Sequence, residues 1–366
     1  MNHTTVVSTS SGEGVVIIGA RKFLLPVALG AALALAGCTS GAGAATGSAV
    51  AGTSEMSDPT ATPVAGENDP APTADGEAAT PGQEPPAEPV LTERVVQLAP
   101  GIADEASGIA SSRGNPGAYF LVDDSQDHIV ALASDGSVLA IVGIEGMSET
   151  NAEAISSGTC GSIPLPDGAS SDTCLYIGDI GDNSSRRRDI VVYRIAEPDL
   201  AVPPTDPVTA DEWRYTYPEG AQDAESMMVG TDGSIVIVTK PEAGRSPTRI
   251  YRGEAGGGDL ALIREFTPPE PAMALKTFFT GNVAVDVSAE PGRVLLLTYD
   301  ELSEYIAPDP NADLTTFPDW PHRRLLMPSL PQAEGVTGDV DGCGYVLASE
   351  AGPGGDNGSL GFVTCG

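Results

Sequence analysis

The feature that most constrains the fold is an internal repeat within residues 92–366. Five segments share one pattern, in which a polar residue and a small residue are followed by an acid, in most copies, and then by an apolar run. They are EASGIASS from Glu105, NAEAISSG from Asn151, DAESMMVG from Asp223, NVAVDVSA from Asn282 and QAEGVTGD from Gln332. Each is followed by a Gly-containing turn and a second strand-like run: AYFLV, CLYIG, SIVIV, RVLLL and GYVLA. The five starts lie 46, 72, 59 and 50 residues apart, which leaves room for several strands in each unit.

The repeat predicts an all-β fold, a single β-propeller of about five four-stranded blades. Third strands are visible as HIVAL, IVVYRI and TRIYR, and fainter fourth strands as SVLAIVG, EWRYTYP, LALIREF and RRLLM. Four strands at this period are typical of propeller blades. The 72-residue interval leaves a sixth blade open. The last unit lacks a fourth strand, and ERVVQLA at 93–99 precedes the first unit, so we expect this N-terminal strand to complete the last blade and close the ring.

Residues 1–38 predict a lipoprotein signal peptide. Arg21 and Lys22 precede the apolar run FLLPVALGAALALAG, which ends at Cys38. A positive segment before a short apolar stretch is typical of a secretory signal. The last four residues, LAGC, resemble the bacterial lipobox. That resemblance implies lipid transfer to the Cys38 thiol, cleavage before it, and an exported protein anchored to the outer face of the cell membrane.

Residues 39–91 predict a disordered acidic tether. The segment is rich in Ala, Gly, Thr and Pro, carries eight carboxylates, and has no Lys, Arg or aromatic residue. Such a composition cannot bury enough apolar surface to offset the entropy of ordering. We therefore assign the propeller domain to residues 92–366.

The net charge of −33 excludes nucleic acid as an expected partner. Residues 92–366 carry about −26 of it, once the single net positive charge of 1–38 and the eight carboxylates of 39–91 are set aside. This balance favours cations, basic partners or plain solubility. We expect a monomer that binds a small polar ligand or a cell-envelope protein.

Four cysteines remain for disulfides in an exported chain. They form two local pairs in the sequence, Cys160 with Cys174 and Cys343 with Cys365. Three connectivities are open, and proximity favours the local one.

The propeller geometry brings polar residues of all five repeats to one axis. The first strand of each blade lines the central channel, and side chains two apart in a strand share a face. The first tier is Glu105, Asn151, Asp223, Asn282 and Gln332. The second tier is Ser107, Glu153, Glu225, Ala284 and Glu334. The second strands end at the same face, at Asp124, Asp179, Lys240, Tyr299 and Glu350.

We interpret these residues as a polar funnel with a candidate Ca²⁺ site. Clustered carboxylates repel one another unless a cation, a proton or a basic group lies between them, and hard oxygen ligands suit Ca²⁺. The predicted metal ligands are Glu153, Asp179, Asp182, Glu225 and Glu334. The residues predicted to bind a ligand are Glu105, Asp124, Asn151, Asp223, Lys240, Asn282, Tyr299, Gln332 and Glu350. The spacing D-x-[QG]-D occurs twice, at Asp124 and Asp127 and at Asp179 and Asp182. The alternative is that Asp and Asn in these turns bond to local backbone.

With the repeat established, the chain resembles exported β-propeller lipoproteins of actinobacteria, loosely of the TolB-like or SMP-30-like kind, that carry a DIGDN motif. The matching stretches are EASGIA at 105–110, LYIGDIGDN at 175–183, VVYRIAEP at 191–198, DAESMMV at 223–229, VTK at 238–240 and LLTY at 296–299. The resemblance covers most of residues 100–350 and implies the fold rather than an activity. The chain departs from it at 151–154, NAEA in place of an acidic D-W-E-D type stretch, and at Leu297, where Arg is frequent. Both departures weaken any catalytic role transferred from the resemblance.

Two functions follow from the sequence. The first is a lipid-anchored binding module with an acidic central funnel. The second is a Ca²⁺-dependent hydrolase of lactone, ester or phosphoester type, in which Glu153, Glu225 or Asp179 acts as metal ligand or base. The chain has three histidines, of which His3 lies in the leader, and no G-x-S-x-G, so nucleophilic hydrolysis is disfavoured.

Overall fold

A computed structural model describes residues 91–147, 151–240, 247–269, 284–339, 342–352 and 357–365. The predicted signal peptide with Cys38, and the tether apart from Leu91, lie outside the described residues, as does Asn282. Within the described residues no helix is long and apolar enough to cross a membrane.

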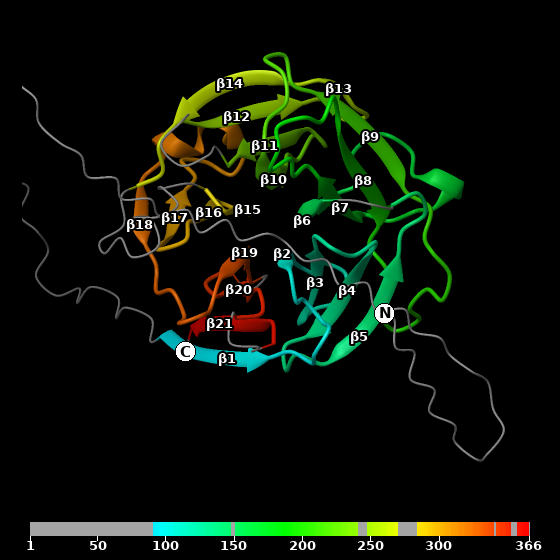
Figure 1. Ribbon diagram of the computed structural model, residues 1–366, viewed down its shortest axis with the longest axis vertical. Coiled ribbons are helices and arrows are strands. Elements are labelled where there is room, and N and C mark those ends of the chain that lie inside the picture. The colour runs from blue at the N-terminus through cyan, green and yellow to red at the C-terminus, as the bar shows by residue number, and fades with distance from the viewer. Residues whose placement is uncertain are drawn as a thin grey trace, which may run out of the picture. The chain divides into compact units, whose positions relative to one another are not determined.

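The described chain folds into five antiparallel blades arranged around an axis (Figure 1). Blade one contains β2 (Ala106–Ser111), β3 (Ala118–Asp123), β4 (His128–Ala133) and β5 (Val138–Gly143). Blade two contains β6 (Ala152–Thr159), β7 (Thr173–Asp179), β8 (Ile190–Ala196) and β9 (Asp211–Thr216). Blade three contains β10 (Ala224–Val229), β11 (Ile235–Thr239), β12 (Thr248–Gly253) and β14 (Ala261–Phe266). Blade four contains β15 (Asp286–Glu290), β16 (Arg293–Leu297), β17 (Leu302–Ile306) and β18 (His322–Arg324). Blade five contains β19 (Ala333–Gly338), β20 (Tyr345–Ser349), β21 (Ser359–Cys365) and β1 (Leu91–Gln97).

The prediction of a propeller is confirmed, and the blade count is five. The 72-residue interval holds no sixth blade. Part of it forms the loops on either side of the short 3₁₀ helix η1 (Pro166–Gly168) and the connection from β8 to β9. The predicted fourth strand RRLLM is only the three-residue β18, which is preceded by a second 3₁₀ helix, η2 (Leu314–Asp319).

The ring closes as expected, through the N-terminal strand. β1 pairs antiparallel with β21, from Leu91 opposite Cys365 to Gln97 opposite Ser359. The innermost strands contact one another in chain order, β2 with β6, β6 with β10, β10 with β15, β15 with β19, and β19 with β2 (Figure 1). Blade five therefore contains both ends of the described chain.

The core lies between blades. Inner strands such as β2 and β3 are buried along their whole length, whereas the outer strand β5 exposes Val138, Leu139 and Ile141. Each inter-blade layer combines residues from two neighbours; Phe120 and Val122 of blade one, for example, belong to the same cluster as Ile177 of blade two. This layered burial supplies the apolar free energy that holds the blades together.

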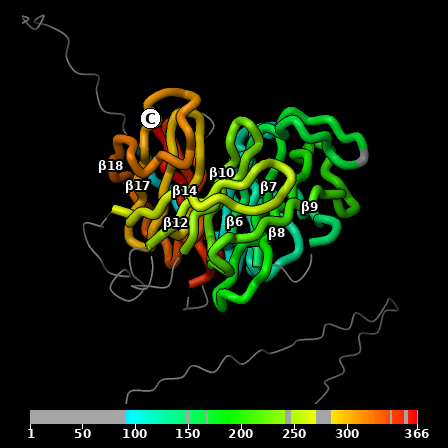
Figure 2. Tube along the Cα trace, turned by 90° about the horizontal axis from the view of Figure 1, so that it is seen from above, coloured from blue at the N-terminus to red at the C-terminus, as the bar shows by residue number. Residues whose placement is uncertain are grey.

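Blade three also reaches onto blade two. The two-residue strand β13 (Gly258–Asp259) pairs parallel with β9, so blade two becomes a five-stranded sheet. Blade three lies between blade two and blade four in the edge view, with β10, β12 and β14 between β9 on one side and β18 on the other (Figure 2). The strand β13, which comes from blade three, is thus hydrogen-bonded to the outer edge of blade two.

Both predicted disulfides are confirmed. Cys160 and Cys174 join the end of β6 to β7, with their Cα atoms 4.9 Å apart. Cys343 and Cys365 join the start of the β20 hairpin to the end of β21, with Cα atoms 6.1 Å apart.

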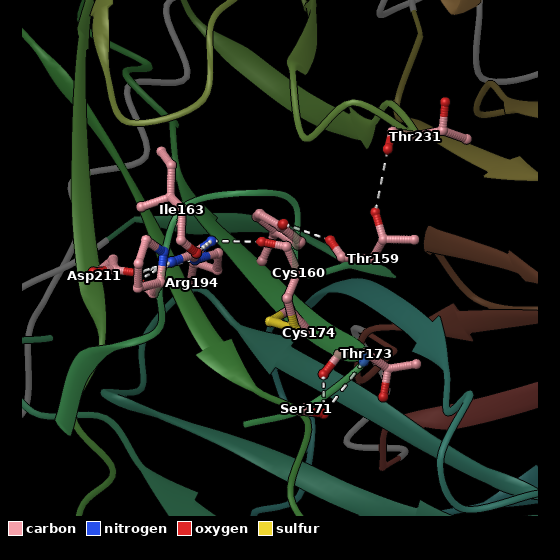
Figure 3. Close-up of a disulfide and its surroundings, with 11 residues drawn as sticks. Thr159, Cys160, Ile163, Ser171, Thr173, Cys174, Arg194, Asp211 and Thr231 are labelled. Carbon is pink, nitrogen blue, oxygen red and sulfur yellow. Dashed lines mark hydrogen bonds and ion pairs between the residues drawn. A yellow bond between two sulfur atoms is a disulfide. The ribbon is translucent and has the colours of Figure 1, made fainter. Parts of the chain in front are cut away.

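Arg194 organises the loop closed by the first disulfide (Figure 3). Its side chain is fully buried and donates hydrogen bonds to the carbonyl oxygens of Cys160 at 2.5 Å, Ile163 at 3.0 Å and Pro164 at 3.0 Å. It also pairs with Asp211 and lies 4.9 Å from the Trp213 ring centroid. One guanidinium thereby satisfies several backbone carbonyls that would otherwise be buried without donors.

Substitution Arg194→Ala is expected to lower the free energy of unfolding by about 3 kcal/mol, because it leaves the Asp211 carboxylate and three backbone carbonyl oxygens without their hydrogen-bond donor. The matched control Arg214→Ala removes a surface arginine of β9 with a 57% exposed side chain, and should cost under about 1 kcal/mol. Urea unfolding with the disulfides intact measures both. Equal losses would contradict the role assigned to Arg194.

Candidate functional site

A β-bulge at the start of the inner strand positions the second predicted tier. In four blades the strand begins with alanine, at Ala106, Ala152, Ala224 and Ala333, and the register shifts just after it. The residues left out of the pairing are Ser107, Glu153, Glu225 and Glu334. Bulges re-aim a side chain, and these four are only 5–6% exposed.

The structure brings carboxylates from four blades into one electrostatic group, which we call the axial carboxylate cluster. It comprises Glu105, Asp124, Glu153, Glu225, Glu334 and Glu350. Lys240 supplies its cation: Nζ lies 2.8 Å from Glu225 Oε1 and 5.3 Å from the Tyr299 ring centroid. Gln332 Nε2 donates hydrogen bonds of 2.8 Å to both Glu334 and Glu350, so it bridges two carboxylates.

One lysine does not neutralise six carboxylates, and the pKa values show the excess. Burial, together with Glu225 and Asp124, raises the pKa of Glu153 to about 10. Burial, with Glu334 and Glu105, raises the pKa of Glu350 to about 8, and burial with Glu105 raises that of Asp124 to about 6. Burial disfavours the charge on Lys240, but Glu225 and Glu334 outweigh it and raise the pKa of the ammonium. Glu153 therefore carries a proton at neutral pH.

The predicted register was wrong at Asp179. Asp179 pairs with Ala152 as Asp123 pairs with Ala106, so its counterpart is Asp123 rather than Asp124. Both accept a hydrogen bond from the backbone N–H that precedes that alanine, Glu105 N to Asp123 at 3.1 Å and Asn151 N to Asp179 at 2.9 Å. Ser349 accepts from Gln332 N in the same way, at 3.0 Å. The sequence analysis missed this shared cap because it aligned the aspartates one residue out.

Asp179 and Asp182 have local partners. Asp179 pairs with Arg187 through two hydrogen bonds of 2.6 and 2.8 Å. Asp182 accepts from the backbone N–H groups of Arg186 and Arg187, each at 2.6 Å. Their role as Ca²⁺ ligands stays a prediction, and the hydrogen bonds support the alternative of a turn closed by its own side chains.

The glycine of DIGDN is required by close approach. A Cβ on Gly181 would lie 1.9 Å from Asn151 Nδ2 and 2.5 Å from Glu153 Oε1. Asn151 in turn donates its amide to Glu153, and Asp182 N donates to Asp223 Oδ1 at 2.7 Å. The motif thus packs against the cluster and connects it to Asp223, without supplying its carboxylates.

Blade four breaks the pattern. Asp286 pairs with Leu297 as Ser226 pairs with Val238, so Val285, and not the predicted Ala284, aligns with Glu225. Ala284 instead aligns with the strand-starting alanines, and the predicted first-tier residue Asn282 lies outside the described residues. The sequence analysis did not select Asp286, which aligns with Gly108, Ala154 and Gly335 in other blades.

Asp286 joins blades four and five at the axis. Its carboxylate accepts hydrogen bonds from Val287 N at 2.7 Å and Val336 N at 2.8 Å. Burial raises the pKa of Asp286 well above its usual value, and Glu225 and Glu334 add to the shift. Asp286 is 5% exposed, and it lies one position further along the inner strand than the residues that align with Glu225.

Among the described residues, no three His, Cys, Asp or Glu side chains are arranged to hold a metal ion. Within the cluster, Glu225 raises the pKa of Glu153, and Glu334 raises the pKa of Glu350. The predicted ligand-binding residues Lys240, Tyr299 and Gln332 lie among them. Asp223 lies next to Asp182 at the side of the group.

Comparison with known proteins yields likeness of fold alone. The chain is similar to the PQQ-bound aldose sugar dehydrogenase of Streptomyces coelicolor (12% identity, 76% of this chain and 100% of that one, TM-score 0.38). It is also similar to a gluconolactonase of Xanthomonas campestris (12% identity, 75% of this chain and 90% of that one, TM-score 0.39). A third similar structure is virginiamycin B lyase of Staphylococcus aureus (10% identity, 75% of this chain and 99% of that one, TM-score 0.36). No protein-family model matches the chain, and no curated protein matches it in sequence.

The cluster is expected to make the protein less stable as pH rises. A carboxyl whose folded pKa exceeds its unfolded one stabilises the fold below the unfolded value, and the effect is lost as pH rises towards the folded value. The raised pKa values of Glu153, Glu350 and Asp124 place that loss between about pH 4 and 10. The free energy of unfolding falls by up to about 1.4 kcal/mol per pH unit for each proton released. Glu153→Gln should flatten the decline in thermal melts from pH 5 to 8, whereas the exposed control Glu265→Gln should not. Parallel curves for wild type and Glu153→Gln would refute the assignment.

Asp286 is expected to act as a neutral acceptor. Asp286→Ala should lower the free energy of unfolding at pH 7 by about 2 kcal/mol, since it leaves two buried N–H groups without acceptors. Asp286→Asn keeps a carbonyl acceptor and should cost less. Urea unfolding of both variants decides the point, and an asparagine variant as unstable as the alanine one would show that the charge itself is needed.

Proposed function

We propose that this β-propeller is a binding module whose axial carboxylate cluster receives a cation. The observation that carries the proposal is the surplus of acid at the axis: six carboxylates face one lysine, and three of them have raised pKa values. A cation that enters such a group replaces protons and relieves the repulsion between carboxylates.

Lys240 illustrates how the cluster holds a positive charge. Its ammonium pairs with Glu225 and faces the ring of Tyr299, an arrangement that combines an ion pair with a cation–π contact. The remaining members, Glu105, Asp124 and Glu350, are exposed or half-buried and can be reached from solvent. A second cation therefore has carboxylates available on the open side of the group.

Ca²⁺ is the cation we propose first. The described side chains do not form a metal site as they stand, so Glu153, Glu225 and Glu334 would have to draw together to hold it, with the Gln332 amide oxygen nearby. Hard oxygen donors are the ligands that Ca²⁺ prefers. Bound Ca²⁺ would polarise an oxygen of a ligand.

The protein is further proposed to act at the outer face of the cell membrane. The support is the sequence alone: the lipobox ending at Cys38 and the acidic segment 39–91, which would hold the propeller away from the anchor. A small polar ligand or a cell-envelope protein is the proposed partner.

A hydrolase is the second candidate, and one observation favours it. Glu153 holds its proton at neutral pH, while its neighbour Glu225 is paired with Lys240. Two carboxyl groups whose environments differ in this way are the pattern used for general acid and base catalysis.

Calcium titration tests the binding proposal. Calorimetry at pH 7 in buffers of different ionisation enthalpy should show Ca²⁺ binding with proton release, because Glu153 and Glu350 give up protons to the incoming charge. Glu225→Gln should weaken binding about tenfold or more, and Glu265→Gln should leave it unchanged. No heat and no change in melting temperature up to millimolar Ca²⁺ would refute the proposal.

The same preparation separates the two functions. Lactone, ester and phosphoester substrates are offered with Ca²⁺ or with EDTA. Turnover that EDTA and Glu225→Gln both abolish would establish the hydrolase, whereas Ca²⁺ binding without turnover supports the binding module.

A further inference from the structure

A second polar site lies on the opposite face of the propeller. A pocket of about 360 Å³ opens between blades three and four, at the ends of the inner strands, whereas the axial carboxylate cluster lies at their starts. The pocket extends inward to Arg113 and Glu290, which also line a narrow recess at the axis. Its volume falls in the range of small-molecule sites.

The inner end of the pocket offers both hydrogen-bond donors and acceptors. Glu290 Oε1 accepts from Gly338 N at 3.0 Å and from Ser288 Oγ at 3.1 Å. Glu290 is among the residues that line the pocket. Arg113 contributes the positive charge that acts on Glu290.

The outer end of the pocket combines polar and apolar lining residues. Arg252 pairs with Asp232 at 2.6 Å, and Thr231 and Asn311 are exposed. The apolar part of the lining is Val236, Ala307, Ala312, Leu314 and Trp320.

The charges that line this pocket nearly balance, unlike those of the axial cluster. The lining contains three arginines and four carboxylates: Arg113, Arg252, Arg293, Asp232, Glu290, Asp309 and Asp313. Arg252 pairs with Asp232, and Arg293 bonds to Glu304 at 2.9 Å and to Gly344 O at 2.7 Å. An anionic ligand would find no surplus positive charge, and a cationic ligand would find an excess of one carboxylate. A neutral ligand that donates and accepts hydrogen bonds around a compact carbon frame matches the lining.

We propose that this pocket binds a neutral, hydroxyl-rich small molecule of one or two rings, the chemistry of an uncharged saccharide. Its hydroxyl groups bond to Glu290 and Arg113 at the inner end and to Asn311 at the outer end. Its C–H face lies against the wall that contains Leu314 and Trp320. This site is independent of the axial cluster and of the cation proposed there.

Ligand-observed NMR and calorimetry on the full chain test the proposal with glucose, N-acetylglucosamine, maltose and mannose. At least one should bind, and Thr231→Trp, which fills the mouth of the pocket, should weaken binding about tenfold or more. Asn311→Ala should weaken it severalfold. Thr92→Trp, the same change on the exposed outer strand β1, and the axial variant Glu225→Gln should leave it unchanged.

Two charged analogues, gluconate and glucosamine, sharpen the experiment. Both should bind more weakly than their neutral counterparts. The proposal is overturned if no saccharide binds, if Thr231→Trp binds as well as wild type, or if a charged analogue binds more tightly than the neutral sugar.

Discussion

The close approach of neighbouring inner strands at the axis governs the rest of the structure. A Cβ on Gly108 would lie 2.9 Å from Ile155 N, and one on Gly335 would lie 3.0 Å from Ile109 N, so backbone meets backbone where blades adjoin. Gly108 and Gly335 must therefore stay small at this level, whereas blade four has Asp286 at the aligned position. The bulge just before the contact turns Glu153, Glu225 and Glu334 towards the axis.

The two faces treat charge in opposite ways. At the strand starts the chain collects acid beyond what Lys240 can neutralise, and protons on Glu153 and Glu350 make up part of the difference. At the strand ends each buried arginine has a partner, as Arg293 has Glu304. This contrast supports the two proposals, that one face exchanges protons for a positive charge and that the other takes a ligand without net charge.

The fold was predictable because every blade repeats one local pattern, and a period shared by five segments leaves few architectures. The disulfides followed from proximity. The site was harder, because a one-residue shift is invisible in sequence yet changes which side chain faces the axis. Asp179 was placed beside Asp124 although its backbone partner is Ala152, and blade four was aligned on Asn282 although Asp286 pairs as Ser226 does. Bulges that displace one residue, and the surface pocket formed by distant loops, leave no periodic signal.

The join between β1 and β21 also decides how the ring responds to mechanical load. A pull on the chain at Leu91 acts first on the pair formed with Cys365, at the outermost edge of blade five. The bond between Cys365 and Cys343 ties β21 to the hairpin of β20, so β21 would stay in blade five when β1 is pulled away. Peeling would then stop at one strand, and the other blades would keep their mutual packing under force.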